Sequence, residues 1–361
     1  MLGVGLIGGS IGLAARRAGD TTVVGWDPDP GSLERALARG ALDETGDSIP
    51  AAVEGADVCF VCAPVSGVAA TAKAALGSGG DCVVSDVGSV KLAVLDELAD
   101  ASAERFVGGH PLAGAEASGV EHARAELFEG ATWYLTPTDR TSGVHYDRLY
   151  RTVTALGARP AAIAADAHDR LMATVSHLPH VLANVLVGQA ARELVEESQG
   201  LPATGPSFRD ATRVAGANPP LWRDIFVSNR EAIVQELDAY AQALASVRER
   251  LRAGDGGALE DWIEEARTDR QRLLESQLAG GPVSELRVPV PNRPGIVAQL
   301  ALALSEAGIN IVDMALYPAP DMRSGAIALW VAGEGSAERA AELVAGLGYA
   351  ASPVDSGGGE T

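Results

Sequence analysis

Three glycines near the start of the chain constrain its fold more than any other feature. Gly3, Gly5 and Gly8 have the spacing G-x-G-x-x-G, and Leu6 and Ile7 lie between the last two. Glycines at this spacing let a backbone approach a pyrophosphate closely at the N-terminus of a helix. The motif therefore predicts a nucleotide-binding turn between a strand and a helix.

An acidic residue follows at the expected distance. A strand-like run over residues 21–26 leads to Asp27, roughly 20 residues beyond the last glycine, where an acid accepts the ribose hydroxyls. An acid there also repels a 2′-phosphate, so the sequence predicts NAD rather than NADP. The strand that should precede the glycines is missing, because Met1 lies almost on the first of them. We therefore expect the sheet to lack a central strand, or the true N-terminus to lie upstream of Met1.

Helix and strand patterns alternate beyond the glycines. Helical patterns cover residues 32–39, 66–76, 89–101 and 144–156, and strand patterns cover residues 57–63, 81–86, 105–108, 131–136 and 159–163. This alternation is typical of a parallel, doubly wound sheet that binds its ligand at the carboxyl edge of the strands. We predict an α/β Rossmann-type NAD-binding domain over residues 1–164, with its first strand truncated.

From residue 165 the pattern is helical only. A long apolar-rich segment covers residues 166–197, and long amphipathic segments cover residues 222–252 and 259–278. Helices of this kind commonly bury an apolar stripe on a second subunit. We predict an all-α substrate and dimerisation domain over residues 165–280, and a homodimer.

A third pattern follows Gly280, Gly281 and Pro282, which mark a boundary. Strand, helix, strand, strand, helix and strand patterns cover residues 285–290, 295–307, 309–316, 326–331, 337–347 and 350–354. This order is that of the ferredoxin-like split β-α-β arrangement. We predict a C-terminal α+β domain over residues 284–355.

Composition limits the partners of the protein. A net charge of −20 argues against nucleic acid or an acidic membrane as a partner. No apolar run reaches about 18 residues and no secretory signal is recognisable, so we expect a cytoplasmic protein without a membrane span. Cys59 and Cys62 form a C-x-x-C, but they lie in a buried strand pattern and no further ligand completes a site. We interpret them as small core residues and expect no metal.

We place the chemistry in the stretch from Gly109 to Glu116. His110 follows a short apolar run, so it can face a ligand across the edge of the sheet. Pro111 fixes the backbone beside it, and the glycines allow tight turns. From these residues alone, a structural histidine in a loop is an equally good interpretation.

Two further stretches carry candidate groups. Ser89 lies at a strand-to-helix junction, where it is either a simple N-cap or a contact to substrate or nicotinamide. His177 and His180 share a helix face, and Pro179 between them predicts a kink or a helix start that turns His177 out of line. A metal pair would need a third ligand, and none is in view.

Arginines follow in the helical half. The two-pronged guanidinium suits a carboxylate, and Arg209, Arg213 and Arg223 compete for that role. Surface ion pairing is the alternative for each of them. The residues alone do not choose between these arginines.

Five motifs occur in one order along the chain. They are Gly3-x-Gly5-Leu6-Ile7-Gly8-Gly9-Ser10, Asp86-x-x-Ser89-x-Lys91, His110-Pro111-Leu112-Ala113-Gly114-x-Glu116, Ser176-His177-Leu178-Pro179-His180, and Thr212-Arg213 followed by Trp222. Together they resemble the prephenate dehydrogenase family, which includes arogenate dehydrogenases. The resemblance covers residues 1 to about 280.

The C-terminal part is similar to the ACT family of regulatory amino-acid-binding domains. The similarity lies in residues 291–295 and 308–311, and the usual acid of the loop is replaced here by Asn292. It implies allosteric regulation, with tyrosine or phenylalanine as effector. The implied effector-binding residues are Asn292, Arg293, Gly295 and Asn310.

The family resemblance implies an NAD-dependent oxidative decarboxylation of prephenate to 4-hydroxyphenylpyruvate, in tyrosine biosynthesis. His110 would be the neutral base for the ring hydroxyl, and Ser89 and His177 would line the pocket near substrate and nicotinamide. Arg213 would bind a substrate carboxylate. Glu116 and Trp222 would be further pocket residues.

Other functions stay open. The residues do not separate prephenate from arogenate, which an arogenate dehydrogenase would convert directly to tyrosine. A 3-hydroxyacid dehydrogenase of similar plan would use a lysine in the helical half, but the only lysines are Lys73 and Lys91. A catalytically silent amino-acid sensor is disfavoured by the intact set of His110, His177 and Arg213.

Overall fold

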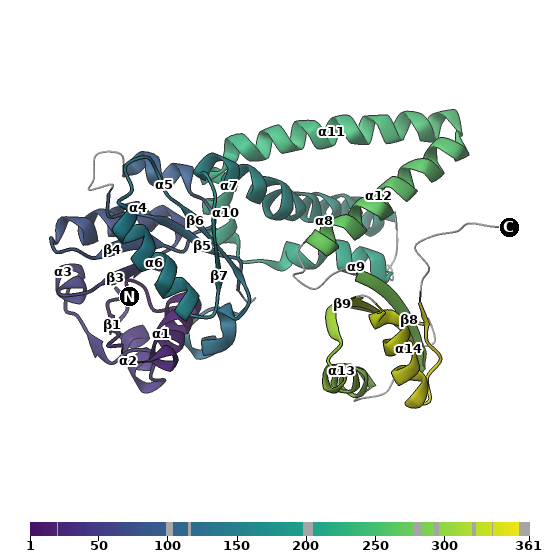
Figure 1. Ribbon diagram of the computed structural model, residues 1–361. Coiled ribbons are helices and arrows are strands. Elements are labelled where there is room, and N and C mark those ends of the chain that lie inside the picture. The colour runs from purple at the N-terminus through teal and green to yellow at the C-terminus, as the bar shows by residue number, and fades with distance from the viewer. Residues whose placement is uncertain are drawn as a thin grey trace. The chain divides into compact units, whose positions relative to one another are not determined.

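The computed structural model describes residues 1–19, 21–98, 104–114, 117–197, 205–276, 283–291, 296–319, 323–333 and 335–353. They belong to two compact units, Met1–Gln242 and Ala243–Thr361 (Figure 1). The boundary falls within one long helix, and each unit has its own hydrophobic core.

The first unit opens with the predicted alternation of strands and helices. Its elements are α1 (Leu6–Ala18), β1 (Val24–Gly25), α2 (Pro30–Ala38), β2 (Glu44–Thr45), α3 (Ile49–Val53), β3 (Val58–Val61), α4 (Val65–Gly77), β4 (Val83–Asp86), α5 (Leu92–Glu97), β5 (Gly108–Pro111), β6 (Thr132–Thr136), α6 (Gly143–Ala155) and β7 (Arg159–Ala162). β1 pairs with β2 and β3 with β4, both in parallel. This part of the chain has the expected Rossmann-like character.

The expectation of a missing central strand was wrong. Leu2 forms parallel bridges to both Trp26 and Val61. Its N–H donates to the Phe60 carbonyl at 2.9 Å, and its own carbonyl accepts from the N–H of Cys62 at 2.7 Å. The flanking strands are themselves only two to four residues long, so three residues at the N-terminus suffice to join them.

The prediction of an all-parallel sheet was also wrong, at one edge. β6 pairs antiparallel with β5 and parallel with β7. The chain between β5 and β6 forms no long helix along the sheet in its described residues. It makes two 3₁₀ turns, Val120–His122 and Ala125–Phe128, which pack against α1. The chain therefore re-enters the sheet at the end where β5 finished, and β6 runs opposite to β5.

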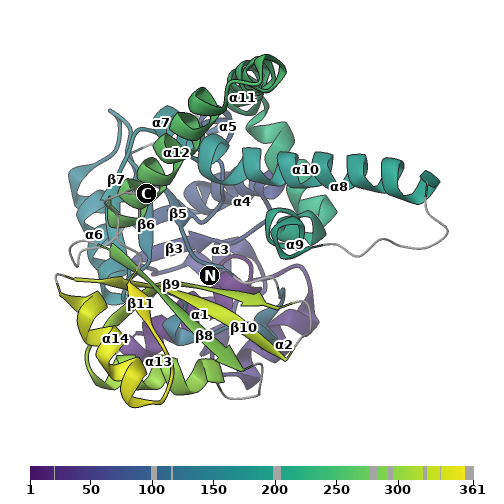
Figure 2. The same cartoon turned by 90° about the vertical axis from the view of Figure 1, so that its right-hand side faces the viewer.

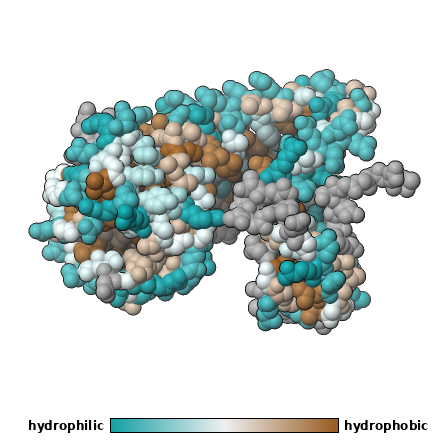
Figure 3. Space-filling model, in the orientation of Figure 1, coloured by the Kyte–Doolittle hydropathy of each residue, from teal (hydrophilic) through white to brown (hydrophobic). Residues whose placement is uncertain are grey.

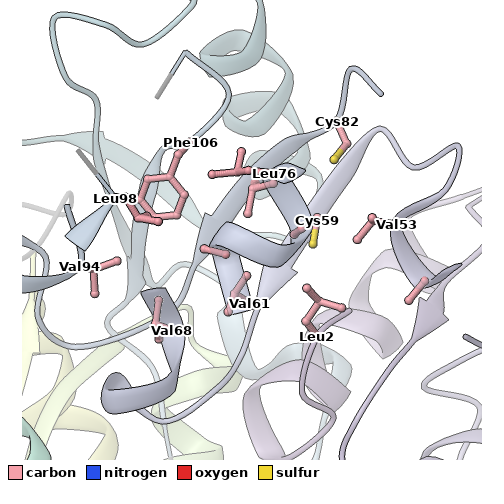
Figure 4. Packing of buried hydrophobic residues seen from close by; sticks show 14 residues of the cluster. Leu2, Val53, Cys59, Val61, Val68, Leu76, Cys82, Val94, Leu98 and Phe106 are labelled. Carbon is pink, nitrogen blue, oxygen red and sulfur yellow. The ribbon is translucent and has the colours of Figure 1, made fainter. Parts of the chain in front are cut away.

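A buried apolar cluster joins the central strands to the helices beside them. Leu2, Cys59 and Val61 belong to it, together with Cys82 and with Phe106 just before β5 (Figure 4). Burial raises the pKa of the Cys59 thiol to about 12. Cys59 therefore acts as a small apolar core residue, as predicted, and so does Cys82. Cys62 is partly buried and packs against a neighbouring apolar cluster.

The helical part of the first unit begins at residue 165. Its elements are α7 (Ala165–Met172), a π turn (Ala173–His177), α8 (Leu178–Glu197), α9 (Pro206–Thr212), a 3₁₀ turn (Arg213–Gly216), α10 (Pro219–Ser228) and α11 (Arg230–Ala253). The predicted irregularity at Pro179 is the π turn: proline has no N–H for the carbonyl of Val175, and the helix widens just before it. The helix predicted over residues 222–252 is divided at Asn229.

One described helix, Ala165–Arg192, is long and apolar enough to cross a membrane by length and composition, although we expected no such segment. Its first half carries His168, Asp169 and His177, all buried. The His168 ring contacts Tyr134 of β6, and Asp169 accepts hydrogen bonds from the start of α5. These are the contacts of a helix within a globular unit.

The second unit contains α12 (Gly256–Ser276), β8 (Val283–Pro291), α13 (Ile296–Glu306), β9 (Asn310–Pro318), β10 (Ser324–Ala332), α14 (Ser336–Gly346) and β11 (Ser352–Pro353). The sheet order is β11-β8-β10-β9 with antiparallel neighbours. α13 and α14 pack on one face of it (Figure 2), around Leu286, Leu300 and Leu329. From α12, Arg270 lies 4.6 Å over the ring of Trp330. This is a ferredoxin-like topology, with the elements in the predicted order.

Candidate active site

A cavity of about 370 Å³ lies at the carboxyl end of β5 in the first unit. Ser89, His110, His177 and Trp222 all line it, so the structure brings together four side chains predicted from separate motifs. Apolar surface surrounds α7, the start of α8 and α10 on the face in Figure 3. Most of the residues that line the cavity are apolar, and a few polar side chains point into it, as expected for a small-molecule site.

His110 lies within β5 rather than in the loop after it. It is half-buried and stands opposite Tyr134 of β6. A Cβ atom on Gly109 would lie 2.6 Å from the carbonyl oxygen of Asp86, and one on Gly108 would lie 2.3 Å from Oγ1 of Thr136. Gly109 is therefore needed for β5 to approach β4 closely, and Gly108 for β5 to approach β6.

A buried ion pair fixes the peptide before His110. The Lys91 side chain is 1% exposed, forms an ion pair with Asp86, and donates from Nζ to the Gly109 carbonyl at 2.6 Å. The Asp86 carboxylate also accepts from the N–H of Gly109 at 3.1 Å and of Gly88 at 2.9 Å. Burial lowers the pKa of Lys91, and the charge of Asp86 opposes this. Neither charged residue was predicted to have a role at the site.

His110 is held in its neutral form. Burial lowers its pKa well below the ordinary histidine value of 6.5, and the nearby Lys91 charge lowers it further. Its Nδ1 lies 2.9 Å from Nε2 of His168, and Nδ1 of His168 lies 2.8 Å from Oδ1 of Asp169. This adjacent His–Asp pair was not predicted to be part of the site.

His177 is the second neutral imidazole. Its side chain is fully buried in the π turn, and burial lowers its pKa to about 4. Its Nδ1 lies 3.0 Å from Nδ2 of Asn229, and its Nε2 has no hydrogen-bond partner among the described residues. That nitrogen is therefore available to a ligand.

Aromatic contacts hold the ring of Trp222 at the cavity. The ring stacks on His180, with centroids 3.3 Å apart, and meets His177 edge-on at 6.0 Å. Burial lowers the pKa of His180, and the Arg213 charge adds to this effect. Arg213 is exposed in its 3₁₀ turn near this stack, and it is not one of the residues that line the cavity.

Ser89 and Glu116 are two further predicted site residues. Interpreting Ser89 as an N-cap was wrong, because α5 begins only at Leu92 and its first N–H groups donate to Asp169. Ser89 instead lines the cavity. Glu116 lies outside the described residues.

The glycine loop has the geometry of a dinucleotide site. Gly3 has a φ of +97°, and a Cβ on Gly8 would lie 2.1 Å from the Gly3 carbonyl oxygen, whereas Gly5 faces open space. α1 starts at Leu6, and no side chain caps it. Its first N–H groups are therefore available to a pyrophosphate.

Asp27 holds the glycine loop in place through a hydrogen bond to its backbone. Its Oδ2 accepts from the N–H of Val4 at 2.9 Å, and its Oδ1 accepts from Asp29. A carboxylate oxygen accepts more than one hydrogen bond, so the acid also suits ribose hydroxyls. Leu6 and Ile7 form the first turn of α1. The residues of the loop thus fit NAD.

The remaining predictions concern the second unit and metals. Asn292, Arg293 and Gly295 lie outside the described residues, and of Asn310 the structure describes only the backbone, at the start of β9. Among the described residues, no group of three or more His, Cys, Asp or Glu side chains could hold a metal ion.

Family models match most of the first unit and part of the second. The model described as prephenate dehydrogenase, nucleotide-binding domain, matches residues 11–161. The model described as prephenate dehydrogenase, dimerization domain, matches residues 164–265.

Relatives and solved structures give the same family. A prephenate dehydrogenase of Bacillus subtilis is 29% identical over 352 residues, which cover 95% of this chain and 94% of that protein. A cyclohexadienyl dehydrogenase of Zymomonas mobilis is 35% identical over 279 residues, which cover 76% and 94%. The Aquifex aeolicus prephenate dehydrogenase in complex with hydroxyphenyl propionate and NAD⁺ is similar with a TM-score of 0.71, 32% identity, and 75% and 96% coverage. The Synechocystis arogenate dehydrogenase is similar with a TM-score of 0.68, 28% identity, and 75% and 98% coverage.

Proposed function

Because the chain belongs to the prephenate dehydrogenase family, we propose that its cavity oxidises prephenate to 4-hydroxyphenylpyruvate through His110. The protein is an NAD-dependent oxidoreductase of that family. The observation that carries the proposal is the neutral His110 imidazole on a cavity at the carboxyl end of the sheet.

The chemistry divides between cofactor and protein. Oxidation of the ring alcohol and loss of the ring carboxylate as CO₂ leave an aromatic ring, and aromatisation supplies the driving force. When bound, NAD supplies the hydride acceptor. The protein has to align the alcohol and remove its proton.

Each residue of the cavity then has a role. His110 is neutral at pH 7 and accepts the hydroxyl proton. Ser89 lines the same cavity, and His177 offers its free ring nitrogen to an oxygen of the substrate. Trp222 closes the apolar side against the substrate ring. Arg213, which lies near His180, binds a substrate carboxylate. We propose Glu116 as a further pocket residue.

The second candidate substrate is arogenate, because the Synechocystis relative is an arogenate dehydrogenase. Arogenate carries an amino group where prephenate carries a keto group. Steady-state kinetics with NAD and each substrate tests both proposals. We expect NADH formation with prephenate at the higher kcat/KM. A higher kcat/KM with arogenate would identify arogenate as the preferred substrate. Absence of turnover with both compounds would refute the proposed dehydrogenase function.

We propose that the chain has three domains, with boundaries near residues 164 and 280. We also propose that two copies of the chain form a homodimer through the helices of the middle domain. Val185, Val187 and Val234 are exposed apolar side chains on α8 and α11. The family model that matches this region is described as a dimerization domain. Light scattering should give twice the monomer mass, and a monomer at micromolar concentration would contradict pairing.

As a biosynthetic enzyme, the protein would work in the cytoplasm.

We also propose that the C-terminal α+β part is an ACT-type domain that binds tyrosine or phenylalanine. The β11-β8-β10-β9 order supports this, and so does the Bacillus subtilis match, whose coverage of 95% of the chain must extend into this part. The proposed contacts are Asn292, Arg293, Gly295 and Asn310. Calorimetry on active enzyme should detect binding of one of the two amino acids, and no heat with either would reject it.

A further inference from the structure

His110 is the end of a chain of three hydrogen-bonded side chains. The His110 and His168 rings meet edge-on with centroids 5.1 Å apart, and both His168 and Asp169 are fully buried. These three side chains connect β5 to α7, although His110 and His168 are 58 residues apart in sequence. A buried polar chain of this kind is costly unless every member is satisfied.

Asp169 fixes the direction of each bond. Its Oδ1 accepts from the N–H of Lys91 at 2.8 Å and its Oδ2 accepts from the N–H of Leu92 at 2.9 Å, so both carboxylate oxygens act as acceptors. His168 must therefore donate from Nδ1, and we infer that its Nε2 accepts from His110. His110 donates from Nδ1, which leaves the lone pair on its Nε2 for the cavity.

We propose that His168 and Asp169 are positioning residues that hold His110 in the one tautomer able to act as a base. This inference rests on the proposed role of His110. In the reaction, the substrate hydroxyl proton passes to Nε2 of His110, and the resulting imidazolium keeps its Nδ1–H bond to His168. As CO₂ leaves and the ring becomes aromatic, the oxygen takes this proton back from Nε2, so the product leaves as the phenol and His110 returns to its neutral form. The other tautomer would present an N–H to the hydroxyl and could not accept its proton.

Asp169 also fixes the direction of the hydrogen bond at His177, through its main-chain carbonyl and Asn229. Nδ2 of Asn229 donates to the main-chain carbonyl of Asp169 at 2.8 Å, which fixes the orientation of the amide. The other hydrogen of that nitrogen points to Nδ1 of His177, which therefore accepts. His177 then carries its hydrogen on Nε2. The cavity thus has one built-in acceptor, on His110, and one built-in donor, on His177.

The matched variants His168→Gln and His168→Leu test the proposal in the full-length enzyme. The glutamine carbonyl replaces Nε2 as an acceptor for His110, whereas leucine fills the space without one. We expect His168→Leu to lower kcat for prephenate at least about 10-fold with KM changed less than about 3-fold, as for partial loss of a general base. His168→Gln should recover most of the lost kcat. Wild-type kcat in the leucine variant, or equal losses in both, would overturn the proposal.

A second measurement does not depend on the variants folding. In ¹⁵N-labelled wild-type enzyme, the ring nitrogen signals of His110 report its tautomer directly, with His110→Asn used for assignment. We expect hydrogen on Nδ1, and hydrogen on Nε2 would overturn the inference. If wild-type enzyme turns over neither prephenate nor arogenate, the proposed function fails, while the tautomer still decides this inference.

Discussion

Acid should destabilise this protein through His177, and the size of the effect follows from its burial. The folded-state pKa is about 4, whereas the ordinary value is 6.5. The folded protein therefore keeps this ring neutral while the unfolded chain binds a proton, so stability is lost as the pH falls from 6.5 towards 4. Each unit of pKa difference corresponds to about 1.4 kcal/mol, which gives a loss of about 2 kcal/mol at about pH 5.

The variant His177→Asn isolates this effect. Its amide oxygen takes the place of Nδ1 and accepts from Asn229, but the side chain no longer titrates. Urea unfolding at one protein concentration, followed by tryptophan fluorescence, gives the free energy of unfolding at about pH 7.5 and about pH 5. The wild type should lose about 2 kcal/mol more than the variant between these two pH values, because the contributions of all other groups cancel. Equal losses would refute the neutral, buried state of His177.

Four further results are expected. His110→Asn should lower kcat for prephenate at least about 100-fold with little change in KM, and wild-type turnover would remove His110 from its role. Because burial and Lys91 lower the pKa of His110, kcat/KM should stay level as the pH falls through 6.5 and decline only well below that value; a decline centred on 6.5 would contradict this. Lys91→Met leaves Asp86 buried without its cation, so denaturant unfolding should report a loss of about 3–5 kcal/mol that Asp86→Asn partly restores; an unchanged midpoint would refute the pairing. Arg213→Ala should raise KM for prephenate while kcat changes little, and an unchanged KM would place carboxylate binding elsewhere.

Much of the fold could be predicted from local patterns. The glycine spacing and Asp27 predicted the turn at the start of α1, and periodicity predicted most helices and strands, including those of the second unit. Strand direction was the exception. Periodicity says which face of a strand is buried but not which way the strand runs, so the antiparallel β6 could not be predicted. Pairing of Leu2 with two strands was missed for the same reason, since three residues carry no period.

The candidate site could be predicted only in part. Ser89, His110, His177 and Trp222 stood out in their own motifs, and the structure places all four on one cavity. The groups behind them did not stand out, because their roles depend on contacts across long stretches of chain.

His168 and Asp169 illustrate this limit. The only local signal was an adjacent His–Asp pair early in an amphipathic helix, where a surface ion pair is the ordinary interpretation. Asn229 gave no signal beyond its place in a long helical pattern, yet its amide contacts both His177 and the Asp169 carbonyl. Side chains that orient a catalytic group thus become recognisable only when the tertiary contacts are known.

The most direct test of the central claim is a crystal structure of this enzyme with NAD and hydroxyphenyl propionate. We predict that the phenolic oxygen lies within about 3.2 Å of Nε2 of His110, at hydrogen-bonding distance. A phenolic oxygen bound by other groups, with the His110 ring turned out of the cavity, would contradict the account.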